Sequence, residues 1–92
     1  MTRIEIRRRG AGPEAVRRFA VEVDGHSYDV GVSDSDAQRI APGVPAEELV
    51  RESFRFLLEH EPPGSIMRRF DLPVISRYFP EYERDMERRF RR

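Results

Sequence analysis

Two runs of β-branched and aromatic residues meet at an Asp24-Gly25 pair, and this arrangement constrains the fold more than any other part of the chain. Asp-Gly is a preferred pair for the two-residue type I′ turn that joins antiparallel strands. With the turn at this pair, Phe19 faces Val30, and a slip of one residue would move every side chain to the opposite face. The sequence therefore predicts a β-hairpin within residues 16–32. One of its faces would carry six large apolar side chains: Phe19, Val21, Val23, Tyr28, Val30 and Val32.

The longest helical pattern in the chain, residues 45–61, provides a cover for that apolar face. Pro45 suits the first position of a helix, and Pro62 with the residues after it stops one. Between them, small or apolar side chains recur at intervals of three and four residues, which places them on one broad face: Ala46, Leu49, Val50, Ser53, Phe54, Phe56, Leu57 and Leu58. We expect this central helix to be scaffold, with function on the segments that it supports.

The remaining segments complete the prediction of an α+β fold for a single small domain spanning residues 1–92. Ile4 and Ile6 alternate with charged residues, so the first nine residues are expected to form a third antiparallel strand beside the hairpin. Ser33 with Asp36 resembles a helix cap, which predicts a short helix followed by a loop. The expected order is a three-stranded antiparallel sheet, a short helix and loop, the central helix and shorter C-terminal helices, within residues 1–32, 33–44, 45–61 and 65–90.

The composition excludes several kinds of chemistry. There is no cysteine, so a disulfide, a thiolate nucleophile and a cysteine-bound zinc are all excluded. All 17 basic residues are arginine, and the absence of lysine excludes Schiff-base chemistry and a phosphate-binding P-loop. No apolar run is long enough to cross a bilayer, and the amino terminus lacks the pattern of a signal peptide. We therefore expect a cytoplasmic protein with no membrane contact.

No pattern in the chain is typical of a catalytic, cofactor or metal site. His26 and His60 are the two histidines, and neither lies at a recognisable spacing from a nucleophile. Residues 24–48 hold six acidic residues against one arginine, a charge that could attract a divalent cation, but their spacing fits no calcium loop. We therefore predict a protein that is not an enzyme and that binds no cofactor or metal.

Aromatic residues gather near the carboxyl end in a number that one short terminal helix does not need for packing. Aromatic residues, methionine and arginine are enriched at protein interfaces. The segment predicts a surface for a protein partner or for a second copy of the chain, formed by Tyr78, Phe79, Tyr82, Met86 and Phe90. The alternative, that the last helix only closes the core, stays open at this point. Our leading functional prediction is a non-enzymatic interaction module.

The alternative function is nucleic-acid binding. Residues 65–79 resemble a degenerate helix-turn-helix, in which a short helix would precede a turn and a second, reading helix. Its contacts with nucleic acid would be Arg68, Arg69 and Arg77. Asp71 stands where the turn of that family has glycine, and a net charge of zero does not favour a strong phosphate-binding surface. Nucleic-acid binding is therefore ranked second.

Two runs of residues in the second half of the chain resemble short bacterial proteins of unknown function. The runs are ESFRFLLEHEP, which starts at Glu52, and SIMRRFDLPVISRYFPEYE, which starts at Ser65, and together they cover about a third of the chain. The resemblance carries no family name and no activity, so it implies no site residues.

Overall fold

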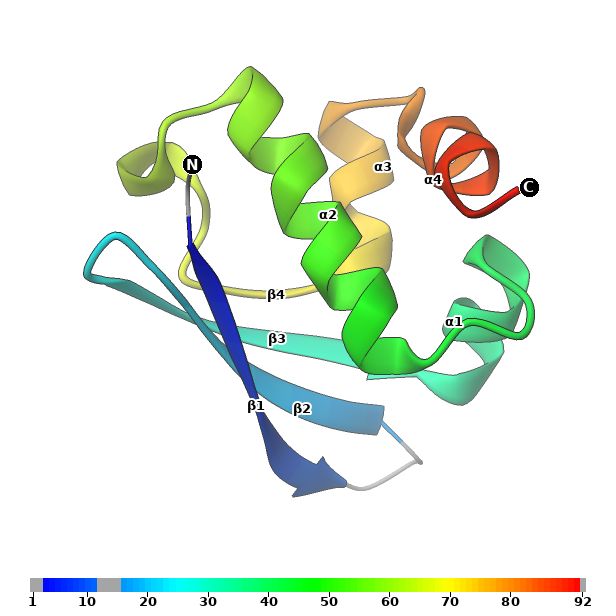
Figure 1. Cartoon of the computed structure of the whole chain (residues 1–92), viewed down its shortest axis with the longest axis horizontal. Coiled ribbons are helices and arrows are strands. Elements are labelled where there is room, and N and C mark those ends of the chain that lie inside the picture. Colours follow the sequence, from blue (N-terminus) through cyan, green and yellow to red (C-terminus); the bar gives the residue numbers. More distant parts are fainter. Residues whose placement is uncertain (1–2, 12–15, 92) are drawn as a thin grey trace.

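The computed structural model describes residues 3–11 and 16–91, and its helices gather on one side of a four-stranded sheet (Figure 1). The strands, which lie side by side in the order of their numbers, are β1 (Ile4–Ala11), β2 (Val16–Val23), β3 (His26–Ser33) and β4 (Arg69–Asp71). The α-helices are α1 (Asp34–Ile40), α2 (Ala46–His60), α3 (Ile75–Tyr78) and α4 (Tyr82–Phe90), and two short 3-10 helices are η2 (Pro63–Ser65) and η3 (Leu72–Val74). The α+β class is as predicted, but the sheet is mixed and has a fourth strand.

The hairpin between β2 and β3 has the predicted turn and register. Asp24 and Gly25 have φ angles of 48° and 82°, the left-handed values that a type I′ turn requires at both central positions. Phe19 pairs with Val30, as the apolar pattern predicts. β1 pairs antiparallel with β2, so the first three strands have the predicted antiparallel pairing, although the sheet that they belong to is mixed and has a fourth strand.

The apolar face of the hairpin packs against α2, which crosses the sheet (Figure 1). Leu49, Val50 and Phe54 of α2 are fully buried. The ring centroid of Phe54 lies 5.1 Å from that of Tyr28 on β3 and 6.0 Å from that of Phe70 on β4. Burying a large apolar side chain contributes about 1.5–3 kcal/mol. The helix predicted over residues 45–61 therefore forms the centre of the core.

The helix α4 is attached to α2 through a buried polar pair. Tyr82 and Met86 of α4 are fully buried. The hydroxyl oxygen of Tyr82 lies 2.6 Å from that of Ser53, and Ser53 donates to the carbonyl oxygen of Leu49 over 2.7 Å. Because the single hydroxyl hydrogen of Ser53 goes to that carbonyl, Tyr82 is the donor in the pair. Both hydroxyls are thus hydrogen-bonded, so their burial leaves no polar group without a partner.

The strand β4 lies within residues 65–90, where the sequence predicts only short helices, so the first of those predicted helices is wrong. β4 runs parallel to β3, and the amide of Asp29 donates to the carbonyl oxygen of Arg68 over 2.7 Å. Within β4, Phe70 alone is buried while both neighbours are exposed, which is the alternation of a strand. The apolar spacing that indicated a helix is short. The backbone groups on the free edge of β3 need hydrogen-bond partners, and pairing with them stabilises a strand here instead of a helix.

An arginine on the sheet face away from the helices connects three strands. Arg18 of β2 donates to Asp29 of β3 over 2.9 Å and to Asp71 of β4 over 3.2 Å. Gly31 of β3 lies beside this contact, and a Cβ atom there would lie 2.4 Å from atoms of both Arg18 and Asp71. Glycine at this position therefore lets the guanidinium reach across β3 to β4.

Candidate functional site

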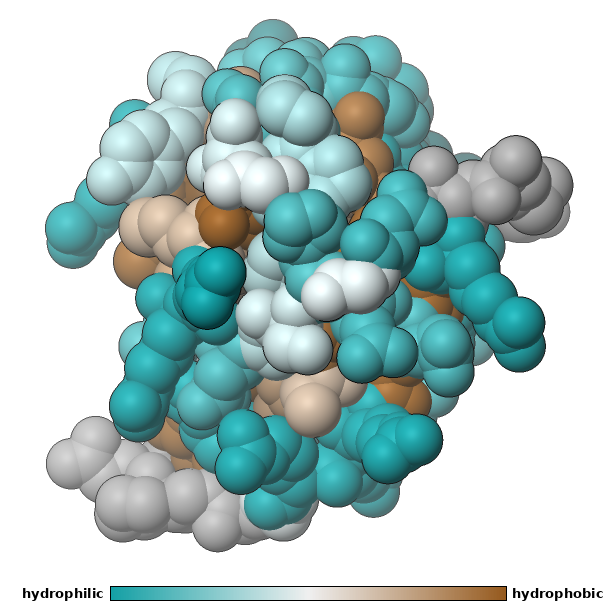
Figure 2. Space-filling view, turned by 90° about the vertical axis from the view of Figure 1, so that its left-hand side faces the viewer, coloured by the Kyte–Doolittle hydropathy of each residue, from teal (hydrophilic) through white to brown (hydrophobic). Residues whose placement is uncertain are grey.

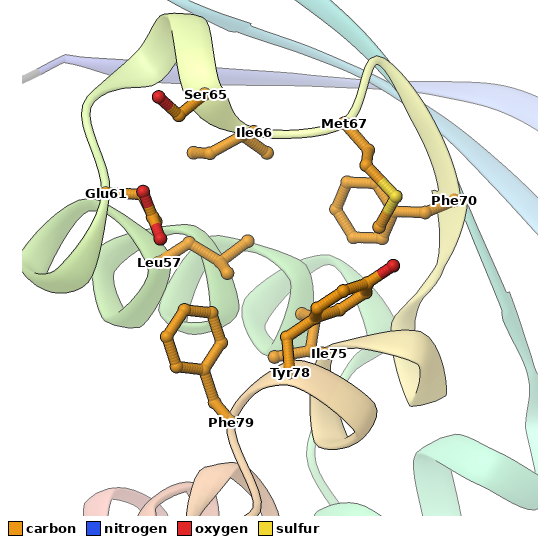
Figure 3. Close-up of a pocket in the computed structure, with 9 residues that line it drawn as sticks. All are labelled: Leu57, Glu61, Ser65, Ile66, Met67, Phe70, Ile75, Tyr78 and Phe79. Atoms are coloured by element: carbon orange, nitrogen blue, oxygen red, sulfur yellow. The ribbon is translucent and has the colours of Figure 1, made fainter.

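A groove lies where the end of α2, the turn at η2, the segment leading into β4, and α3 come together (Figure 3). Its volume is about 200 Å³. Nine residues line it: Leu57, Glu61, Ser65, Ile66, Met67, Phe70, Ile75, Tyr78 and Phe79. We call this feature the α2–α3 groove.

The α2–α3 groove combines core side chains with exposed apolar ones. Met67 and Tyr78 are 41% and 66% exposed, and among residues 3–11 and 16–91 they are the large hydrophobic side chains that are mostly open to solvent or nearly so. Figure 2 shows one face of the molecule, which is largely hydrophilic and on which hydrophobic residues appear in small, separate areas. Four further lining side chains are buried and belong to the core, namely Leu57, Ile66, Phe70 and Ile75.

The two ends of the groove differ in polarity. Figure 3 shows Glu61 and Ser65 at one end, and Met67 and Tyr78 toward the other. Glu61 is half-buried and is the C-cap residue of α2, whose backbone amide donates to the carbonyl oxygen of Leu57 over 2.8 Å. Within the two described ranges, the Glu61 carboxylate has no hydrogen bond and no ion pair. The groove therefore has an acidic end beside an apolar surface.

Aromatic side chains of α2 position Phe79, which forms one wall of the groove. The rings of Phe56 and Phe79 meet edge to face, with centroids 5.7 Å apart and an interplanar angle of 88°. The centroid of the His60 ring lies 5.0 Å from that of Phe79. Edge-to-face aromatic pairs contribute about 0.5–1.5 kcal/mol beyond the burial of their area. The ring centroid of Phe56 also lies 5.6 Å from that of Tyr82, so Phe56 connects the groove wall to the core.

The turn at η2 is held to the hairpin by one side-chain hydrogen bond. The Tyr28 hydroxyl donates to the carbonyl oxygen of Pro63 over 2.6 Å. A tyrosine hydroxyl is protonated at neutral pH and can donate, and burial raises the pKa of this one further. Since the turn carries Ser65, this hydrogen bond helps to place the polar end of the groove.

We expect Tyr28→Phe to lower the free energy of unfolding by about 0.5–1.5 kcal/mol, because the Pro63 carbonyl loses its donor. Amide hydrogen exchange should also become faster at residues 64–67, since the turn is released from the hairpin. Tyr78→Phe is the control, because it removes an exposed hydroxyl and should change neither quantity. Unchanged exchange in Tyr28→Phe would show that this hydrogen bond does not position the turn.

The structure divides the five residues of the predicted protein interface. Tyr78 and Phe79 line the α2–α3 groove. Tyr82 and Met86 are fully buried, so they form no contact surface, and their spacing of four residues reflects packing against α2. Phe90 is half-buried and lines a different hollow, between the ends of α1 and α4.

Sequence reasoning missed most of the groove. Met67 and Phe70 fall within residues 65–90, where the sequence predicts helices but the structure has β4 and the segment before it, and the sequence predicts Glu61 only as the end of the central helix. The one available signal was the charged-apolar-charged alternation around Phe70, which indicates a strand. No local pattern indicates that Glu61 lines the same groove as Ile66, Met67 and Phe70.

The nucleic-acid candidates lie on a segment that holds no helix-turn-helix. Residues 65–79 contain the end of η2 followed by β4, η3 and α3, so the predicted pair of helices joined by a turn is wrong. Arg69 belongs to β4, and its Nε atom lies 3.8 Å from a carboxylate oxygen of Asp29. Arg68 precedes that strand and Arg77 lies in α3, and all three arginines are exposed. Nucleic-acid binding through them stays a prediction.

Acidic residues of the hairpin and of α1 face arginines. Three of their carboxylates form ion pairs, namely Asp29 with Arg18, Asp34 with Arg17 and Asp36 with Arg39. In the part of the chain that the structure describes, no three histidine, cysteine or acidic side chains come together in a way that could hold a metal ion. No helix in that same part is long and apolar enough to cross a membrane.

Comparison with protein-family models, curated proteins and solved structures gives no significant match to this chain. No relative therefore assigns a role to any residue described above. The shape and chemistry of the α2–α3 groove are the basis for the function considered next.

Proposed function

We propose that this protein is a protein-interaction module and that a partner docks in the α2–α3 groove. The observation that carries the proposal is the position of Met67 and Tyr78. Among the residues that the structure describes, these are the large hydrophobic side chains left exposed, and both line the same groove. Exposed apolar side chains that gather at one place are typical of docking surfaces, whereas scattered single ones need no explanation.

The size of the groove favours side chains of a partner over a cofactor. Its volume of about 200 Å³ lies below the roughly 300–1,000 Å³ of pockets that enclose drug-sized ligands. A groove of this size suits one or two large side chains. Anchors of this kind, buried in a small apolar pocket, supply most of the binding energy of many protein interfaces.

The lining of the groove favours binding over a chemical reaction. Its polar side-chain groups are the carboxylate of Glu61 and the hydroxyls of Ser65 and Tyr78. No histidine is among the nine lining residues. Within the described residues, neither hydroxyl is hydrogen-bonded to a base that could activate it as a nucleophile. The arrangement supports a non-enzymatic role.

Selection from a random-peptide phage library on the folded chain is expected to yield peptides that occupy the groove. We expect Tyr78→Asp and Met67→Asp each to weaken binding of those peptides about tenfold or more, because each puts a charge into the apolar contact. Loss of one anchor contact costs more than about 1.4 kcal/mol, which corresponds to a factor of ten in affinity. Fluorescence titration of the selected peptides against each variant measures the effect.

The matched control for these variants is Gln38→Asp, which adds the same charge at an exposed position of α1 outside the groove. It should leave peptide affinity unchanged. Peptides that bind wild type and both groove variants equally would contradict the proposal, and so would a selection that enriches no peptide. A second copy of the chain as the partner stays a prediction, which light scattering of wild type and Tyr78→Asp measures.

A further inference from the structure

We infer that the partner segment of the α2–α3 groove is basic: it places a large apolar side chain on the groove and an arginine or lysine beside Glu61. This inference rests on the proposed docking function and adds the chemistry of the partner. It is carried by the Glu61 carboxylate, which lines the groove next to apolar residues such as Leu57 and Ile66 (Figure 3).

Glu61 differs from Glu52 and Glu59, two acidic residues of α2. Both form ion pairs with Arg89, whose guanidinium nitrogens lie 3.3 Å from a carboxylate oxygen of Glu52 and 2.8 Å from one of Glu59. Glu61 has no such cation among residues 3–11 and 16–91, although it is half-buried. A carboxylate that is partly removed from water gains more from an opposite charge than one in open solvent. A cationic group of a partner would therefore find its strongest attraction at this end of the groove.

The end of α2 adds to this negative potential. α2 has 15 residues, and Glu61 is its C-cap. The last carbonyl groups of a helix carry a partial negative charge, which favours cations and disfavours carboxylates. Glu61 therefore lies where a carboxylate is least favourable for the helix itself, and a bound cation would offset both the helix dipole and the side-chain charge.

The neighbouring apolar surface suits the stem of a long basic side chain. Arginine and lysine lay their aliphatic stems along apolar surface while the charged end reaches a polar partner. In the groove, Leu57 and Phe79 lie between the acidic end and the α3 side (Figure 3). The aromatic ring of Phe79 can also attract a cation through its face. An acidic segment would meet the same apolar surface but would be repelled by Glu61.

Three small probes with one apolar body separate the two contributions: 4-phenylbutylamine, 4-phenylbutan-1-ol and 4-phenylbutyrate. They are titrated into the full chain, and binding is followed by the methyl NMR signals of Leu57, Ile66 and Ile75. We expect all three methyl signals to shift. The amine should bind about two- to tenfold more tightly than the alcohol, as one partly exposed ion pair provides, and the carboxylate should bind most weakly.

Glu61→Gln keeps the shape of the side chain and removes its charge, so the three probes should then bind with equal affinity. Glu81→Gln, at an exposed position before α4 and outside the groove, is the control and should keep the wild-type ranking. The peptides selected on the wild type should in addition be rich in arginine and lysine.

The outcomes distinguish this inference from the proposed function. Methyl shifts with equal affinity for the three probes would overturn the basic partner and leave the docking site in place. Tightest binding of the carboxylate would overturn it in favour of an acidic partner. Light scattering that shows a dimer dissociated by the amine would assign the groove to a second copy of the chain and also overturn it. No methyl shift with any probe would remove the docking site itself.

Discussion

Phe56→Ala is expected to lower the free energy of unfolding by about 3–5 kcal/mol. Phe56 is 1% exposed, and its ring contacts the rings of His60, Phe79 and Tyr82. The alanine variant loses these contacts and leaves a cavity whose neighbours belong to α2, α4 and the end of α3. Since small domains have a total stability of about 5–15 kcal/mol, the loss is a large share of it. Urea denaturation followed by circular dichroism measures the change.

Leu58→Ala is the matched control for this substitution. Leu58 lies two residues further along α2 and is only partly buried at the margin of the core. Its truncation should cost less than about 2 kcal/mol, because a partly exposed site leaves little cavity. An equal decrease in the free energy of unfolding for the two variants would show that Phe56 contributes no more to the packing than a residue at the margin of the core.

The predictable part of the fold is the part decided by neighbouring residues. The Asp24-Gly25 turn and the strict alternation on both sides of it specify the hairpin and its register locally, and the structure has both. The same holds for α1, where the Ser33 hydroxyl accepts from the amide of Asp36 over 3.1 Å as the capping pattern predicts. Each of these elements contains its own start signal, its periodicity or its cap.

The strand β4 could not be predicted in this way. It has three residues, of which only Phe70 is buried, so its alternation is too short to outweigh a helical interpretation. Its stabilising contacts come from distant residues: the backbone of Asp29 and the side chain of Arg18, which pairs with Asp71. A parallel pairing between segments about forty residues apart leaves no local signal in either one.

The groove was predictable only where its residues are unusual in themselves. Tyr78 and Phe79 were singled out because aromatic residues are too many near the carboxyl end for one helix. Tyr82 was placed on the same surface, since a spacing of four residues describes a buried stripe as well as an exposed one. What decides between them is Ser53, a small residue of α2 that leaves room for the Tyr82 ring and bonds its hydroxyl. The position of Glu61 in the groove depends on how the chain runs into β4, which is a non-local feature that the sequence around Glu61 does not indicate.

The buried hydroxyl of Tyr82 is expected to make the stability of the protein fall at alkaline pH. Burial raises the pKa of its hydroxyl well above the ordinary value of 10.0, because the phenolate would be charged in an apolar site. In the unfolded chain the same hydroxyl ionises near pH 10. Above that pH the unfolded state loses a proton that the folded state keeps, so stability falls as pH rises and is fully present below it. The chain has no lysine or cysteine, so its three tyrosines are the side chains that titrate in this range.

We therefore expect the free energy of unfolding of the wild type to be steady up to about pH 9 and to fall above pH 10 by as much as about 1.4 kcal/mol per pH unit for Tyr82. Tyr82→Phe removes the hydroxyl that is hydrogen-bonded to Ser53, so the free energy of unfolding at neutral pH should fall by about 1 kcal/mol. The variant should also lack the part of the decrease above pH 10 that is due to Tyr82. Urea denaturation at a series of pH values measures both quantities. Tyr78→Phe, which alters an exposed tyrosine, should keep the wild-type slope. An equal slope in Tyr82→Phe and wild type would mean that another group, with buried Tyr28 the first candidate, controls the alkaline loss of stability.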